Sequence, residues 1–226
     1  MTDNFTVPNL PRKAGALGAY LGVTHLPLLI SRFLYEQDNL GLEGPLDAVP
    51  IEDCPAFKGR VRVFPSASAV YYAPSDKSGT RGMFRERIRA VQSWRGGPAR
   101  RDCVFIDHDP SVEGFQGLLV ARVHSFLLLK DKKFTYPCAL VMWFSTVGTS
   151  PCPQTGMWMV EPDFDSTGNR AMSIIHIDSI LRGAHIMGNA GNSRIPRHLT
   201  CDDSLDAFSS FFVNKYIDHH AYEIAF

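Results

Sequence analysis

The sequence predicts an α+β fold, in which a small antiparallel β-barrel or curled sheet is braced by N-terminal and C-terminal helices. Short apolar runs recur from residue 58 onwards, and turn-rich stretches such as "DHDPSVEG" and "GTSPCPQTG" separate them. On either side, residues 24–39 and 199–226 space their apolar side chains at helical intervals. We therefore expect two parts: residues 1–57 as a lead-in with one helix and a linker, and residues 58–226 as a β-rich domain with a C-terminal helix.

The predicted lead-in contains one helix between two irregular segments. Residues 1–23 are rich in Gly, Ala and Pro, and we expect them to be loose. The segment "THLPLLISRFLYEQDN" predicts a helix with Thr24 as its N-cap and Pro27 in its first turn. The Pro- and Gly-containing stretch "NLGLEGPLDAVPIEDCPAFKG" predicts the linker that follows.

The spacing of apolar residues changes to that of strands at residue 59. Val61 and Val63 alternate with Arg60 and Arg62, which is typical of a half-buried strand. The basic segment 79–102 is expected to start with a short helix. Further strands are predicted by "ASAVYYA", "DCVFI", "LLVARVHSFLLLK", "TYPCALVMWFS", "GMWMVEP" and "MSIIHIDSILRGAHIM".

The C-terminal segment 199–226 predicts a helix that begins after Thr200 as N-cap, with Asp202 and Asp203 in its first turn. One apolar stripe at helical spacing is expected to cover an open face of the barrel. This stripe consists of Leu205, Phe208, Phe212 and Tyr216.

Composition excludes some classes of protein. The 23 Lys and Arg residues equal the 23 Asp and Glu residues, so the net charge gives no argument for nucleic-acid binding. No run of 18 apolar residues predicts a membrane span, and the N-terminus lacks the pattern of a secretory signal. The five cysteines are widely spaced without a CxxC pair, which favours reduced thiols in a nuclear or cytoplasmic protein that is not secreted.

Several ordered blocks resemble a known family. They include "DCPAFKGRVRVFPSASAVYYAPSDKSGTRGMFRERIRAVQSWRGGPARRDCVFI", "TGMWMVEPD", "IIHIDSILRGAHIMG" and "LDAFSSFFVNKYIDHHAYEIAF". Over residues 25–226 the chain resembles the C-terminal region of fungal Plavaka-type transposases, which are related to the Kyakuja–Dileera–Zisupton group. The resemblance implies that the catalytic carboxylates belong to an upstream region, so no catalytic residue is assigned here. It implies a non-catalytic module that contacts DNA or chromatin proteins.

A weaker likeness concerns the predicted strands between residues 102 and 187. The runs "ARVHSFLL", "CALVMWF" and "MWMVEP" look like those of a bromo-adjacent-homology or other SH3-like barrel. Barrels of that kind act as chromatin-binding or protein-binding modules. This likeness adds an expectation about fold and none about a particular ligand.

One basic stretch is the best sequence indication of nucleic-acid binding. Arginines neutralise phosphates, and an aromatic ring can stack on an exposed base. Glu86 is the one acid between residues 81 and 101. The alternative is a solvated loop that pairs with acids such as Asp107, Asp109 and Asp163. The candidate contact residues are Arg81, Arg85, Arg87, Arg89, Trp94, Arg95, Arg100 and Arg101.

A second candidate is an aromatic pocket. Trp and Tyr rings around a barrel mouth can hold a methylated ammonium group, although aromatic residues of barrels more often fill the core. The residues considered for this pocket are Tyr71, Tyr72, Trp143 and Trp158.

Metal and hydrolase chemistry find little support. His176, Asp178 and His185 lie near one another in sequence, as do Asp218, His219 and His220, but neither group has the tight paired spacing of structural zinc sites. GxSxG, HExxH and P-loop motifs do not occur. We therefore predict no metal and no cofactor. The alternatives left open are a metal-dependent nuclease or transposase remnant, and a transposon relic without activity.

Overall fold

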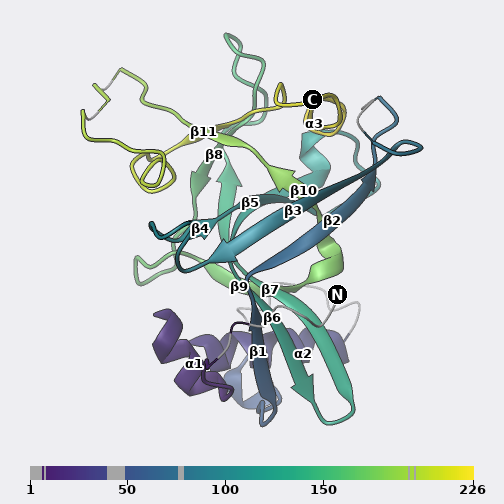
Figure 1. Ribbon diagram of the computed structural model, residues 1–226, viewed down its shortest axis with the longest axis vertical. Coiled ribbons are helices and arrows are strands. Elements are labelled where there is room, and N and C mark those ends of the chain that lie inside the picture. Colours follow the sequence, from purple (N-terminus) through teal and green to yellow (C-terminus); the bar gives the residue numbers. More distant parts are fainter. Residues whose placement is uncertain (1–6, 8, 40–48, 76–78, 193, 196) are drawn as a thin grey trace.

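A long antiparallel hairpin forms the centre of the molecule (Figure 1). The computed structural model describes residues 7, 9–39, 49–75, 79–192, 194–195 and 197–226. The hairpin consists of β6 (Leu118–Asp131) and β7 (Phe134–Thr146). At 14 and 13 residues these strands are far longer than is usual, so different parts of them can belong to different layers.

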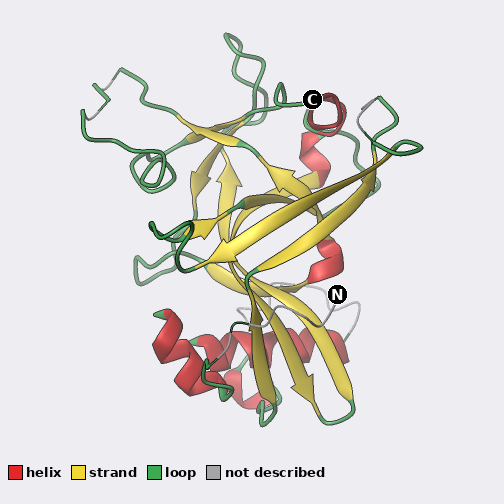
Figure 2. Cartoon of the chain, in the orientation of Figure 1, coloured by secondary structure: helices red, strands yellow, loops and turns green. Residues whose placement is uncertain are grey.

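The other elements surround this hairpin (Figure 2). The α-helices are α1 (Ala14–Leu21), α2 (Leu26–Asp38) and α3 (His219–Ile224), and short 3₁₀ turns occupy Ile51–Asp53, Phe115–Gly117 and Ile177–Ser179. The remaining strands are β1 (Arg60–Phe64), β2 (Ser66–Tyr72), β3 (Met83–Val91), β4 (Arg100–Arg101), β5 (Cys103–Asp107), β8 (Met159–Pro162), β9 (Met172–His176), β10 (Ile180–Ala184), β11 (Ile186–Gly188) and β12 (Phe211–Val213).

The strands form a nearly closed antiparallel barrel, as the sequence predicts. Within the described residues, one sheet runs in the order β10-β5-β6-β7-β8-β12-β11, with β1 added to β6 and β9 added to β7. A second sheet, β2-β3-β4, lies against β10 and β6 and so covers the curved inner face of the first. The α+β prediction is therefore confirmed.

Three apolar clusters share the central hairpin. Helices α1 and α2 pack against β1, β6, β7 and β9 at one end. The barrel interior is filled from β2, β3, β5, β6 and β7, with Phe126 fully buried. At the other end, Phe211 and Trp158 pack with Phe115 and the C-terminal residues. Because one hairpin supplies all three clusters, the terminal helices and the barrel are joined through a continuous core.

The N-terminal prediction needs two corrections. Residues 14–21, expected to be loose, form α1, and its Leu17 is fully buried because it packs in the cluster beneath α2. The second helix starts at Leu26 with His25 as N-cap, so Thr24 does not cap it. Pro27 lies in the first turn as predicted.

The basic segment 79–102 contains strands where a short helix was expected. Its residues alternate along β3, with Glu86 and Ile88 more buried than Arg85 and Arg87. This period of two places the arginines on one face of the strand and the apolar side chains on the other. The helix prediction was wrong because it weighed the charge of the segment above this alternation.

The predicted C-terminal helix is also wrong for most of its length. Residues 201–206 form turns, residues 211–213 form β12 between β8 and β11, and only six residues form α3. In the strand, Phe211 and Val213 point into the core while Phe212 is half-buried and Tyr216 is exposed. The helical stripe does not exist, because strand pairing with β8 and β11 turns Phe211, instead of Phe212, inward.

Candidate nucleic-acid interface

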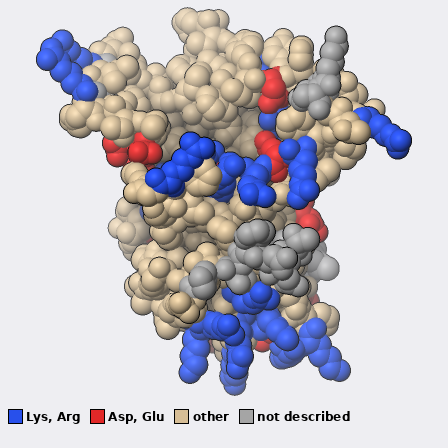
Figure 3. Space-filling view, in the orientation of Figure 1, with Lys and Arg blue, Asp and Glu red and all other residues tan. Residues whose placement is uncertain are grey.

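The outer face of the β2-β3-β4 sheet carries an array of arginines. Arg85, Arg87 and Arg89 alternate along β3 and lie opposite Val70, Ser68 and Ser66 of β2, which share the same face. Arg100 lies opposite Val91 and thus continues this face onto β4. We call Arg85, Arg87, Arg89, Arg95 and Arg100 the outer arginine array. In Figure 3, Lys and Arg side chains gather in a row over this part of the molecule.

Trp94 holds three members of the array in place. The guanidinium carbons of Arg89, Arg95 and Arg100 lie 4.9, 5.5 and 5.3 Å from its ring centroid. Each such contact contributes about 0.5–1 kcal/mol at an exposed site. A base can stack on this ring only if a guanidinium group moves away. The geometry therefore favours a role for Trp94 in fixing the arginines over a role in stacking on a base.

The turn between β3 and β4 gives Arg95 its position. Trp94 donates its backbone N–H to the carbonyl of Pro98, and Gly97 donates to the carbonyl of Trp94, both at 2.9 Å. Arg95 has a φ of 52°, a left-handed conformation that Gly or Asn adopts more readily. The turn thus accepts backbone strain while it places the Arg95 guanidinium over Trp94.

One acid, Asp102, forms hydrogen bonds with the array. The carboxylate of Asp102 accepts a hydrogen bond from the backbone N–H of Arg89 and another from the Nε of Arg100, each at 2.8 Å. This carboxylate neutralises one guanidinium and leaves the others facing solvent. Within the described part of the chain, Asp107, Asp109 and Asp163, the acids considered as partners of a solvated loop, form no ion pair with the array.

Two predicted residues lie elsewhere. Arg81 occupies the turn between β2 and β3 with a φ of 56°, at the far end of the hairpin from Trp94. Arg101 lies opposite Ala90, so it points to the inner face of the small sheet. It therefore belongs to the cleft behind the array.

This cleft has a volume of about 740 Å³ and lies between β3 and β4 on one side and β10 and β11 on the other. Residues 201, 202, 204 and 205 contribute part of its wall. Its lining is highly charged, and several of its charged side chains are buried. The arginines that line it are Arg87, Arg100, Arg101, Arg122 and Arg182, and the acids are Glu86, Asp102, Asp202 and Asp218.

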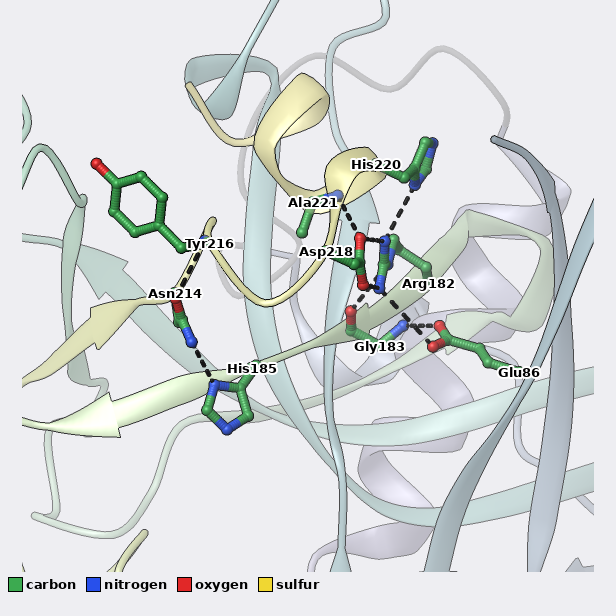
Figure 4. Close-up of polar contacts among 9 residues, drawn as sticks. All are labelled: Glu86, Arg182, Gly183, His185, Asn214, Tyr216, Asp218, His220 and Ala221. Atoms are coloured by element: carbon green, nitrogen blue, oxygen red, sulfur yellow. Dashed lines mark hydrogen bonds and ion pairs between the residues drawn. The ribbon is translucent and has the colours of Figure 1, made fainter. Parts of the chain in front are cut away.

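Arg182 is the centre of a buried network in this cleft (Figure 4). Its two terminal nitrogens donate to both carboxylate oxygens of Asp218 at 2.8 and 2.6 Å. Glu86 lies 4.0 Å from the same guanidinium and accepts the backbone N–H of Gly183. His220 contacts Arg182 at 3.2 Å. The network joins β3, β10 and the start of α3, so it connects the barrel to the C-terminus.

Electrostatics in the network follow from burial and pairing. Burial acts to lower the pKa of Arg182, but the hydrogen bond and charge of Asp218 outweigh it and leave the pKa raised. Burial likewise acts to raise the pKa of Asp218, and the bonds from Arg182 and Ala221 leave it lowered. Burial, followed by the charge of Arg182, lowers the pKa of His220. Both members of the central ion pair therefore stay charged at neutral pH.

The aromatic residues do not form one pocket. Tyr71 is buried, stacks on His220 with centroids 4.6 Å apart, and lies beneath the guanidinium of Arg182. Tyr72 is exposed on the opposite face of β2. Trp143 donates its indole N–H to Ser173, and Trp158 is buried. The structure therefore places the four rings in different surroundings.

Of the residues considered for metal binding, His176 and Asp178 lie 3.4 Å apart, whereas others are engaged in different contacts. Asp218 is bound to Arg182, and His185 contacts the side-chain amide of Asn214 at 3.1 Å. Among the described residues, no group of three or more His, Cys, Asp or Glu side chains is placed to hold a metal ion. None of the described helices is long and apolar enough to cross a membrane.

Sequence reasoning missed Arg122 and Arg182. Each interrupts an apolar strand run, in "LLVARVHSF" and "DSILRGAH", and each is almost fully buried. A charged residue between apolar neighbours in a predicted strand is a signal that could have identified both, because buried charges require partners.

Comparison with known proteins adds no relationship. No family model, curated protein or solved structure matches this chain. The resemblance to transposases and the likeness to bromo-adjacent-homology barrels therefore stay predictions from the sequence.

Proposed function

We propose that the protein is a non-catalytic DNA-interaction module of the nucleus or cytoplasm, which contacts the phosphate backbone through the outer arginine array. The observation that carries this proposal is the gathering of four arginines on one sheet face, with Arg95 from the adjoining turn, where Asp102 is the acid paired to one of the five. Such a face neutralises phosphates and releases their counterions, although the net charge of the chain is zero.

The spacing of the array suits a nucleic-acid backbone. Side chains two residues apart on a strand are separated by roughly 6.6 Å, so Arg85, Arg87 and Arg89 span about 13 Å. One DNA strand passes roughly four phosphates over that length of helix axis. The array would contact the charged phosphates of the DNA backbone, and Trp94 is covered by guanidinium groups. We therefore expect the protein to show little preference for DNA sequence.

Chromatin proteins are a less favoured partner. An aromatic cage for a methylated lysine needs several accessible rings that face one another. Tyr71 is instead covered by Arg182 and His220, and Trp158 is buried. The nuclease alternative has no cluster of carboxylates among the described residues to support it.

The test is binding to labelled double-stranded and single-stranded DNA across a salt series. The wild-type protein should bind at low salt, and log K should fall with log salt with a slope of roughly −4.5 on double-stranded DNA and about −3.5 on single strands if all five arginines meet phosphates. Replacing Arg85, Arg87 and Arg89 by Gln should reduce the slope by about 2–3.

A matched control removes the same charge elsewhere. Lys130, Lys132 and Lys133 are exposed at the turn of the β6–β7 hairpin, where Figure 3 shows a second group of basic side chains. Their replacement by Gln should leave the slope nearly unchanged. Equal loss in both triple variants would mean that overall charge drives binding, and absence of binding at low salt would contradict the proposal altogether.

A further inference from the structure

Two arginines that line the cleft each keep one buried donor without a hydrogen-bond partner, although the Nη2 of Arg101 donates to the Oε1 of Gln92 at 3.2 Å. Arg101 comes from the inner face of β4, and Arg122 comes from β6, where it lies opposite Cys103 of β5. The Nε–H groups of both residues are buried and have no hydrogen-bond partner among the described residues. A buried N–H without an acceptor is unfavourable, and more so in a charged group. Both side chains line the cleft of about 740 Å³.

One carboxylate satisfies this pair only in part. The Nη1 of Arg122 donates to Asp206 at 2.7 Å, and the side chain of Arg122 is 8% exposed whereas that of Asp206 is 64% exposed. Asp206 lines a neighbouring cavity, not the cleft, and contacts Nη1, so the Nε–H of Arg122 is left without an acceptor. Its segment, residues 201–206, is a series of turns closed by short-range bonds such as Thr200 to Asp203 at 2.7 Å.

The local charge is positive as well. Repulsion from Arg122 acts to lower the pKa values of both Arg101 and Arg170, and attraction to Asp206 acts to raise them. Burial, followed by repulsion from Arg122, lowers the pKa of Arg101. The charge of Asp163 also acts to raise the pKa of Arg170. The Nε and Nη2 of Arg170 already donate hydrogen bonds to the carbonyls of Asp163 and Trp143. The two groups with unused donors are thus Arg101 and Arg122.

We propose that Arg101 and Arg122 form a binding site for the phosphate group of a phosphomonoester, and that the Asp206 carboxylate is an internal anion whose charge competes with this phosphate for Arg122. A phosphomonoester group has three terminal acceptor oxygens where a carboxylate has two, so it can accept hydrogen bonds from both guanidinium groups at once. The volume of the cleft lies in the range of small-molecule sites.

The buried floor favours a terminal phosphate over a phosphodiester. A phosphodiester within a strand carries a nucleotide on both sides, whereas a terminal phosphate carries one and can more easily reach the Arg122 side chain, which is 8% exposed and lines the cleft. Two sources share the required chemistry, namely the 5′-phosphate of a nucleic-acid strand and a free nucleoside monophosphate. The inference goes beyond the proposed function, because the site does not require that the outer arginine array bind DNA.

The test follows the arginine Nε–H signals by NMR in the full chain. Inorganic phosphate should shift the Nε–H signals of Arg101 and Arg122 in a saturable manner. Asp206→Asn should tighten phosphate binding about tenfold, the equivalent of ~1.4 kcal/mol, because the competing charge is gone. Asp203→Asn removes the same charge from the same segment, but its carboxylate accepts from Thr200, so it should leave the affinity unchanged. Arg101→Gln should weaken binding.

Two arms identify the source. Stronger binding of a 5′-phosphorylated oligonucleotide than of its 5′-hydroxyl counterpart supports a strand end. Binding of adenosine monophosphate without an effect of oligonucleotide phosphorylation supports a free nucleotide. If phosphate concentrations above roughly 1 mM cause no saturable shift in either the wild type or Asp206→Asn, the proposed site is refuted. Equal tightening of phosphate binding by Asp203→Asn would refute it as well. The Arg85→Gln, Arg89→Gln double variant changes two array residues that do not line the cleft and should still bind phosphate, so failure of the DNA proposal would leave this result intact.

Discussion

Replacement of Arg182 by Met should destabilise the protein by about 2–3 kcal/mol. The Arg182 side chain is 5% exposed and pairs with Asp218, and the change would leave Asp218 and Glu86 without their shared cation. Removal of one partner of a fully buried ion pair costs roughly 3–5 kcal/mol. The Asp218 and Glu86 side chains are 32% and 23% exposed, so water screens the charges that remain. We therefore expect a loss of about 2–3 kcal/mol, below the range for a fully buried pair.

Urea denaturation followed by circular dichroism measures this change in the free energy of unfolding. A double-mutant cycle with Asp218→Asn isolates the pair, and the double variant should lose about 1–2 kcal/mol less than the sum of the single variants. The control Arg85→Met, on the exposed face of β3, should change stability by less than about 0.5 kcal/mol. A loss for Arg182→Met as small as that of the control, or additive single changes, would refute the assignment of Arg182 as the cation that joins β3 and β10 to the C-terminus.

Two further predictions concern the core. Burial, and then the charges of Arg101 and Arg122, lower the pKa of His124 from 6.5 to about 4, so its contribution to stability is present above pH 6.5 and is lost as the pH falls towards 4. Between pH 7 and 4.5 the wild type should lose about 2 kcal/mol more than His124→Gln in urea unfolding, and parallel losses would contradict this. Phe211→Ala should cost about 3–5 kcal/mol, and Phe212→Ala clearly less; the reverse order would contradict the register of β12.

The sequence determined the parts of the fold that depend on local spacing. Val61 and Val63 alternate with arginines and form β1, and the long apolar runs form β6 and β7. The helix around Phe33 also follows from its own periodicity. These predictions succeeded because a strand or helix that buries one face must repeat its apolar residues at its own period.

The same rule explains the errors at the C-terminus and in the basic segment. Phe208, Phe211 and Phe212 fit a helical stripe as well as a strand, and the pairing of residues 211–213 with β8 and β11 decided between them. In β3 the alternation of Arg85 with Glu86 was visible in the sequence, but its charge suggested a loop or a short helix. Short mixed segments are ambiguous, and tertiary pairing then decides their structure.

The candidate sites show the same division. The sequence identified the arginines of the outer array, and the strand register decided that Arg85, Arg87 and Arg89 share a face while Arg101 points inward. The buried ion pairs were beyond local reasoning, because Arg182 meets Asp218 across 36 positions of the chain and Arg122 meets Asp206 across 84. Spacing along a strand is a property of neighbours, whereas the partner of a buried charge is set by which distant segments the barrel brings together.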